Sequence, residues 1–143
     1  MKTSIFVGGL LMLDGRMLLK SEGEATQLWY RTPGKYLEGD ETLEMAVSRG
    51  FKEDTGWMCA VKDLSYVIES FKGDGERDLG LYFLVSVPSA KAREGLRSRL
   101  SFVPMEEMIE MDVRPAVLAG KVFADEKRGA RGSATYLVNY REF

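Results

Sequence analysis

Alternating hydrophobic and polar residues predict several β-strands, and the clearest one lies in the second half of the chain. From Leu79 to Val87 every second residue is large and apolar, as expected for a strand whose side chains point alternately to two faces. The intervening positions include Tyr82 and Leu84, so both faces are largely apolar. This pattern predicts a central strand in a sheet that is covered on both sides.

Shorter apolar runs predict the remaining strands. Ile5 to Leu13 and Met17 to Lys20 are joined by Asp14-Gly15, a turn signal typical of a hairpin. Further strands are expected at 28–32, 61–71, 102–103 and 134–140.

Helical periodicity predicts two main helices. The first runs from about Thr42 to Thr55, with Asp40 or Thr42 as its N-cap and Gly56 beyond its end. The second begins near Asp112 and carries its apolar residues on one face. Strands mixed with helices in the middle and at the end predict an α/β fold, with a mixed sheet between helical layers.

A carboxylate interrupts the apolar stripe of the first helix. The stripe contains Leu43, Ala46, Val47 and Trp57. Asp54 falls on this same stripe, and Glu53 flanks it. A buried charge left bare costs several kcal/mol, so Asp54 must be paired with a cationic side chain or bound to a metal ion. Because the preceding loop at 32–41 is also acidic, this loop–helix unit is a candidate site for a divalent cation.

Composition bounds the class of protein and its partners. The 143 residues are 45% hydrophobic and 29% charged, which fits one globular domain spanning 1–143. The net charge is −2 and there is no basic run, so a nucleic acid polymer is not an expected partner, although a free nucleotide is. No apolar run approaches the roughly 20 residues that span a bilayer, so no membrane association is expected.

Cysteine and histidine content narrows the chemistry. A single cysteine, Cys59, rules out a disulfide within the chain and suits a cytoplasmic protein. The chain has no histidine, which removes the commonest general base and zinc ligand. A metal ion would therefore be held by oxygen atoms, a donor set that favours Mg²⁺, Mn²⁺ or Ca²⁺.

Seven residues in and after the acidic loop stand at the spacing of a known signature: Glu41, Arg49, Phe51, Glu53, Asp54, Gly56 and Trp57. With them, the segment 35–57 resembles the Nudix box of the Nudix hydrolase superfamily, whose members include MutT-like proteins. The resemblance implies a Nudix-type α/β/α sandwich and a cytoplasmic pyrophosphohydrolase. Such an enzyme would cleave a nucleoside diphosphate linked to another moiety and would depend on Mg²⁺ or Mn²⁺. Because similar proteins are often dimers, a homodimer is also expected.

The resemblance further implies roles for individual residues. The metal site would consist of Glu53, Asp54 and the carbonyl of Gly34, and Glu53 would also take part in catalysis. Glu41 and Arg49 would clamp the loop onto the helix by an ion pair. The structural residues of the box would be Glu41, Arg49 and Gly56. Without histidine the general base must be a carboxylate, and the candidates are Glu106, Glu107, Glu69 and Glu76.

Several positions depart from the signature in ways that bear on activity. Lys35 stands where the box begins with Gly, Gly50 where a principal metal-binding Glu is usual, and Asp54 where a longer Glu is usual. Ser101 precedes Phe102 at a point where the family often supplies a further carboxylate. The retained carboxylates are therefore fewer than the signature provides.

Gly50 admits three interpretations. Glycine inside a helix costs about 1 kcal/mol relative to alanine, so Gly50 is retained to let the helix approach a neighbour closely. Alternatively, the site has lost a ligand and hydrolysis is weak or absent. In the third interpretation another carboxylate has replaced the missing one, and the candidates are Glu38, Glu69 and Glu76.

Substrate contacts are expected from Lys35, Arg31 and Tyr82. Arg31 would contact phosphates, and Tyr82 would form a wall for a base. Lys35 either binds a phosphate oxygen or takes the place of a cation by pairing with Glu53 and Asp54. Two functions remain open: a pyrophosphohydrolase, or a catalytically weak or inactive domain that binds a nucleotide or a protein partner.

Overall fold

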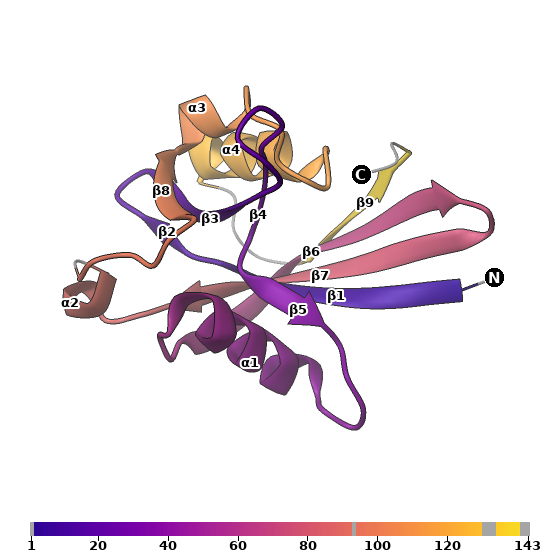
Figure 1. Ribbon diagram of the computed structural model, residues 1–143, viewed down its shortest axis with the longest axis horizontal. Helices are drawn as coiled ribbons and strands as arrows, with labels where there is room; N and C mark the ends of the chain where they lie inside the picture. The colour runs from indigo at the N-terminus through magenta and orange to yellow at the C-terminus, as the bar shows by residue number, and fades with distance from the viewer. Residues whose placement is uncertain (1, 93, 130–133, 141–143) are drawn as a thin grey trace.

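Two β-sheets form the frame of the protein, whose computed structural model describes residues 2–92, 94–129 and 134–140 (Figure 1). The larger sheet contains, in spatial order, β5 (Gly34–Tyr36), β1 (Lys2–Leu10), β7 (Glu76–Ser86), β6 (Ala60–Gly73) and β9 (Thr135–Asn139). The smaller sheet contains β2 (Met12–Leu13), β3 (Arg16–Glu22) and β4 (Trp29–Arg31), with β8 (Leu100–Pro104) paired to β3.

Helices cover both sides of the larger sheet. On one side α1 (Leu43–Thr55) packs against β1 and β5, and the short α2 (Ser89–Ala92) lies beyond the end of β7. On the other side lie α3 (Met105–Met108), α4 (Leu118–Arg128) and the smaller sheet (Figure 1). The predicted mixed sheet between helical layers is therefore confirmed.

The strand predicted to be central is central. β7 pairs in parallel with β1 and antiparallel with β6. Its side chains alternate between two buried clusters, with Leu81, Phe83 and Val85 in the cluster under α1 and Tyr82 in the cluster under α4. The apolar character of both faces follows from this double burial.

The predicted N-terminal hairpin is wrong in its first half. The turn at Asp14-Gly15 does join two strands, but they are the short β2 and β3. β1 instead enters the larger sheet between β5 and β7. Val7 is buried in the cluster under α1 and Leu10 in the cluster under α4, so β1 needs covering layers on both faces, which a two-stranded hairpin would lack.

The first predicted helix is confirmed, including both ends. The hydroxyl of Thr42 accepts the N–H of Met45 at 3.1 Å, and Gly56 ends the helix in a left-handed conformation with φ of 81°. The second helix begins at Leu118 rather than near Asp112. The segment before it is held as an extended neighbour of β4, because Tyr30 exchanges backbone hydrogen bonds with Asp112 and Arg114.

Among the described residues, no helix combines the length and apolar character needed to cross a bilayer.

Candidate functional site

An ion pair fastens the acidic loop to α1, as predicted. The Arg49 guanidinium donates to both carboxylate oxygens of Glu41, with Nε–Oε2 and NH2–Oε1 distances of 3.0 and 2.7 Å. The same side chain donates to the carbonyl of Tyr36, and Glu41 also accepts the N–H of Glu38. These hydrogen bonds, the one from Arg49 above all, lower the pKa of Glu41 below its ordinary value.

Asp54 is buried in the last turn of α1 and is paired with two cationic side chains. Its Oδ1 lies 2.9 Å from Nζ of Lys20 on β3, and its Oδ2 lies 3.0 Å from NH1 of Arg31 on β4. The N–H of Gly34 on β5 also donates to Oδ2, at 3.0 Å. The exposed fraction of the Asp54 side chain is 3%, whereas those of Lys20 and Arg31 are 24% and 17%. The carboxylate on the apolar stripe is thus balanced by positive charge from the chain itself.

These donors keep Asp54 ionised. Burial alone would raise the pKa of this carboxyl, but the hydrogen bonds from Arg31, from the Gly34 N–H and from Lys20 outweigh it. The pKa of Asp54 therefore lies below its ordinary value.

Glu53 is exposed, and its carboxylate is also paired. Its Oε2 lies 3.3 Å from Nζ of Lys35 and 3.5 Å from NH1 of Arg49. Lys35 therefore meets one of the two carboxylates that were expected to attract it, while Lys20 and Arg31 occupy the other.

Gly50 sits where α1 passes directly over β5. A Cβ atom at this position would lie 2.7 Å from the backbone nitrogen of Lys35 and 2.8 Å from the carbonyl carbon of Gly34. Contacts that short with backbone atoms cannot be relieved by a rotamer change. The close packing of the first interpretation is therefore present, and any side chain here, including a glutamate, would push α1 away from β5.

The surrounding contacts decide whether a divalent cation fits. Each Asp54 oxygen already faces a cationic nitrogen, and Gly34 presents its N–H to the carboxylate. Within 2–92, 94–129 and 134–140 there is no group of three or more Asp, Glu, Cys or His side chains that could share a metal ion. Positive charges this close repel a further cation, so this donor set does not fit Mg²⁺ or Mn²⁺ as it stands. Metal binding by Glu53, Asp54 and Gly34 stays a prediction that requires these ion pairs to open.

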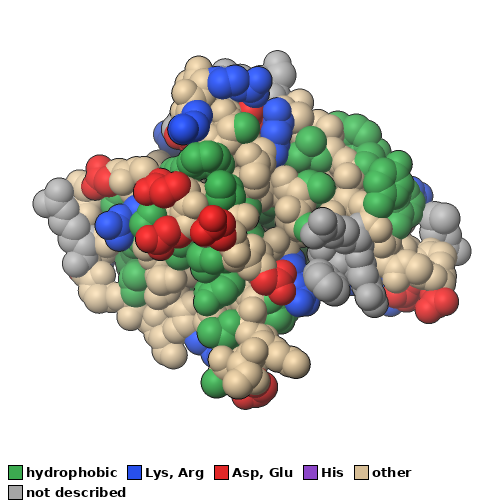
Figure 2. All heavy atoms as spheres, turned by 90° about the horizontal axis from the view of Figure 1, so that it is seen from above, with side chains coloured by type: hydrophobic (Ala, Val, Ile, Leu, Met, Phe, Trp, Pro, Cys, Tyr) green, Lys and Arg blue, Asp and Glu red, His purple; other side chains and the backbone are tan. Residues whose placement is uncertain are grey.

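The predicted base candidates lie apart from α1. Glu106 and Glu107 are exposed on α3, on the other side of the larger sheet, where Figure 2 shows acidic side chains gathered at the surface. Glu69 on β6 is paired with Arg77 and Tyr136. The exposed Glu76 starts β7 beside the β6–β7 turn. None of them approaches Glu53 or Asp54 closely enough to form a shared metal site, and their catalytic roles stay predictions.

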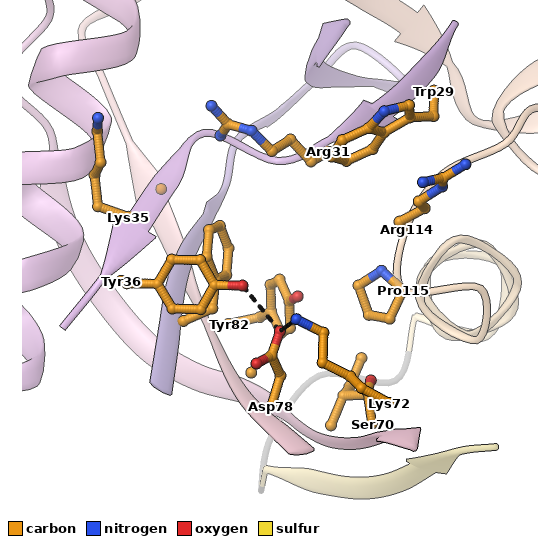
Figure 3. A pocket seen from close by; sticks show the side chains of 14 residues that line it. Trp29, Arg31, Lys35, Tyr36, Ser70, Lys72, Asp78, Tyr82, Arg114 and Pro115 are labelled. Carbon is orange, nitrogen blue, oxygen red and sulfur yellow. Dashed lines mark hydrogen bonds and ion pairs between the residues drawn. The ribbon is translucent and has the colours of Figure 1, made fainter. Parts of the chain in front are cut away.

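A pocket of about 450 Å³ opens beside Gly34 and Arg31, between the larger sheet and the segment 114–115 (Figure 3). Its floor is the sheet face carrying Phe6, Gly80 and Ile68. Gly80 leaves room for the Tyr82 side chain on this face, because a Cβ at position 80 would lie 2.7 Å from the Tyr82 ring. The opposite wall consists of Trp29, Arg114 and Pro115.

Positive charge and aromatic surface dominate the pocket. Its cationic lining residues are Arg31, Lys35, Lys72 and Arg114, and its carboxylate is Asp78. Each cation also has a carboxylate partner, which is Asp54 for Arg31, Glu53 for Lys35, Asp78 for Lys72 and Asp112 for Arg114. Its aromatic lining residues are Phe6, Trp29, Tyr36 and Tyr82. The guanidinium of Arg114 lies over the Trp29 ring, 4.6 Å from its centroid. Such a lining suits an anionic ligand with a flat ring system.

The three residues predicted to contact substrate, Lys35, Arg31 and Tyr82, all line this pocket. Their contact with a substrate stays a prediction. Sequence reasoning missed Trp29, Asp78 and Arg114, because single residues in strands and loops give no periodic or spacing signal. Lys20 was also missed as the partner of Asp54.

No protein-family model matches the chain, and no curated protein matches it by sequence. Solved structures do match its fold. The solution structure of the ORF135 protein of E. coli has a TM-score of 0.74 at 20% identity, over 93% of this chain and 96% of that chain. A NUDIX hydrolase from Nitrosomonas europaea has a TM-score of 0.66 at 21% identity, over 91% and 92% of the two chains.

An ADP-ribose pyrophosphatase from Streptococcus suis has a TM-score of 0.61 at 10% identity, over 94% of this chain and 98% of that chain. Identities this low speak for the fold alone. These likenesses agree with the mixed sheet that lies between α1 and α4. The protein has the fold of the Nudix hydrolases.

Proposed function

We propose that this protein binds a nucleotide or a nucleotide derivative in the pocket beside Arg31, and that it hydrolyses phosphoanhydrides weakly or not at all. One observation carries the proposal: both carboxylates at the end of α1 are paired with cationic side chains of the chain, while a basic, aromatic pocket lies next to them. Arg31 and Lys35 belong to both features, so a phosphate group bound here would share these two cations with Asp54 and Glu53.

The binding half of the proposal rests on the size and chemistry of the pocket. A volume of about 450 Å³ suits a small organic ligand. Lys35 and Arg31 border the edge of the pocket nearest α1, and their charged ends are directed toward Glu53 and Asp54 (Figure 3). A diphosphate at this edge would accept charge-assisted hydrogen bonds from them in competition with these carboxylates. Trp29 and Tyr82 provide flat apolar surface for a base. The structural similarity to an ADP-ribose pyrophosphatase, which its name says acts on a nucleotide derivative, agrees with this ligand class.

The catalytic half rests on the residues of α1. Asp54 is held by Lys20, Arg31 and the Gly34 N–H, so freeing it for another ligand would expose buried positive charge. Gly50 leaves no room for a carboxylate between α1 and β5. A site arranged in this way supports binding better than metal-assisted attack on a phosphorus atom.

A second candidate is the Mg²⁺- or Mn²⁺-dependent pyrophosphohydrolase, which the likeness to structures of hydrolases favours. It requires the ion pairs of Asp54 and Glu53 to open when metal and substrate arrive together. It also requires a base, for which the predicted candidates are Glu106 and Glu107. The two candidates differ in whether metal produces turnover.

Isothermal titration with ADP and with ADP-ribose, first in EDTA and then with Mg²⁺ or Mn²⁺, separates the two candidates. We expect binding in EDTA and no metal-dependent release of products by chromatography. Lys35→Met should weaken binding about tenfold by removing one charged contact. Lys52→Met, on the exposed face of α1, should leave binding unchanged. Steady turnover that appears only with metal would refute the proposal in favour of the hydrolase.

A further inference from the structure

The end of the pocket away from Arg31 holds a carboxylate that is paired with a lysine. Asp78 is the one carboxylate among the described residues that line it. In Figure 3 Asp78 lies with Lys72 and Ser70 at the end away from Lys35 and Arg31. A ligand that places phosphates at the edge with Lys35 and Arg31 would extend its other end toward Asp78, since these residues lie at opposite ends of the pocket (Figure 3).

The two oxygens of Asp78 have different surroundings. Oδ2 accepts the hydroxyl of Tyr36 at 2.9 Å and lies 3.2 Å from Nζ of Lys72 (Figure 3). Neither contact uses Oδ1, and no hydrogen bond to Oδ1 occurs within the described part of the chain. The carboxylate is thus fixed in orientation through one oxygen, and the other keeps its capacity to accept a hydrogen bond.

The two phenols near Asp78 stay protonated at neutral pH. Burial raises the pKa of Tyr36 to about 12, with the hydrogen bond to Asp78 adding to the effect, so Tyr36 goes on donating to Oδ2. Burial also raises the pKa of Tyr82, and the negative charge of Asp78 contributes. This end of the pocket therefore presents an anchored acceptor beside a neutral hydroxyl that can donate or accept.

On the basis of the proposed function, we infer that Asp78 binds the base of the nucleotide and determines which base is accepted. The bases selected carry an exocyclic amino group next to an unprotonated ring nitrogen, as adenine and cytosine do. The amino N–H donates to Oδ1, and the ring nitrogen accepts from the hydroxyl of Tyr82. Uracil reverses both partners, with a carbonyl oxygen in place of the amino group and an N3–H in place of the unprotonated ring nitrogen. In the same pose its carbonyl oxygen faces the carboxylate, which repels it. The discrimination depends on charge and hydrogen bonding and needs no difference in shape.

Two pairs of probes test this recognition. Purine riboside 5′-diphosphate differs from ADP only in lacking the amino group, whereas UDP differs from CDP both in a carbonyl at the amino position and in a protonated ring nitrogen. By isothermal titration in EDTA, we expect ADP and CDP to bind at least about tenfold more tightly than their counterparts, as a hydrogen bond to a charged acceptor provides.

Variants at Asp78 attribute the preference to this side chain. Asp78→Ala should bring the affinity ratio of each pair close to one and leave purine riboside 5′-diphosphate binding unchanged or tighter. If Asp78→Ala only disturbed the structure of the pocket, the affinity for both nucleotides of a pair would fall. Asp78→Asn keeps the shape of the side chain and should give a smaller ratio than the wild type. Asp63→Asn, exposed on β6 and outside the pocket, should keep the wild-type ratio.

The outcomes distinguish this inference from the proposed function. Equal binding of both members of each pair, or an unchanged ratio in Asp78→Ala and Asp78→Asn, overturns the role of Asp78 and leaves nucleotide binding intact. If no member of either pair binds the wild-type protein, the proposed function fails and the inference falls with it.

Discussion

At the scale of single residues, the pairing of Asp54 sets a test of stability. Asp54→Asn removes the charge that balances Lys20 and Arg31, both of which are largely buried. Removing one partner of a buried ion pair leaves the other charge uncompensated. We expect a loss of about 3 kcal/mol in the free energy of unfolding at pH 7, at the lower end of the range for buried pairs, because both cations keep some contact with solvent. Urea denaturation measures it. The exposed neighbour gives the control, since Glu53→Gln should change stability by less than about 1 kcal/mol.

The lowered pKa of Asp54 gives a second test. Because its folded-state pKa lies below the unfolded-state value of about 4, the unfolded chain binds more protons in acid. The stabilisation is complete above the unfolded-state pKa and is lost as pH falls through the folded-state pKa. Urea midpoints measured from pH 7 down to pH 2 should therefore converge for the wild type and Asp54→Asn. A gap that stays constant over this range would show that the charge of Asp54 does not stabilise the fold.

Helix α1 shows how far the sequence specifies an element and where it stops. Periodicity, the Thr42 cap and Gly56 located both ends of the helix, because these signals are local. β1 was misassigned, because its partners β5 and β7 are chosen by tertiary packing and its own pattern suits a hairpin equally well. β5 has three residues, too few for any periodicity to appear.

The packing of α1 on β5 sets the test at the scale of elements. Alanine is the better helix former, so Gly50→Ala should stabilise α1 by about 1 kcal/mol if nothing else changed. Its Cβ would instead collide with the backbone of β5, and we expect a net loss of about 1–3 kcal/mol. Gly120→Ala on α4 is the matched control, because a Cβ there meets no atom within 4 Å. That variant should gain up to about 1 kcal/mol in chemical denaturation. A stabilised Gly50→Ala protein would mean that α1 and β5 are not in close contact.

At the scale of the molecule, the sequence located the candidate site but left its chemistry open. It placed Asp54 on a buried face and left two outcomes, a cationic side chain or a metal ion. The choice depends on Lys20 and Arg31, which lie 34 and 23 residues from Asp54 along the chain. Lys20 reaches Asp54 from β3, whose Leu18 packs in the same buried cluster as Phe51 of α1, and no spacing in the sequence encodes that contact.

The same ion pairs predict how the whole molecule responds to divalent cations. A ligand that binds only the folded state raises the free energy of unfolding by RT ln(1 + [L]/Kd), so a metal ion present at 100 times its Kd would add about 2.7 kcal/mol. Because Lys20 and Arg31 already pair with Asp54, we expect the same thermal midpoint in millimolar Mg²⁺ and in EDTA. The two solutions are brought to the same ionic strength with NaCl.

ADP should raise the midpoint equally in both solutions, because the charges that would hold its phosphates belong to the protein. A rise of several degrees with Mg²⁺ alone would show that the ion pairs open for a metal ion. In that case Asp54 would exchange two cationic side chains for one divalent cation, and Asp54→Asn would abolish the rise.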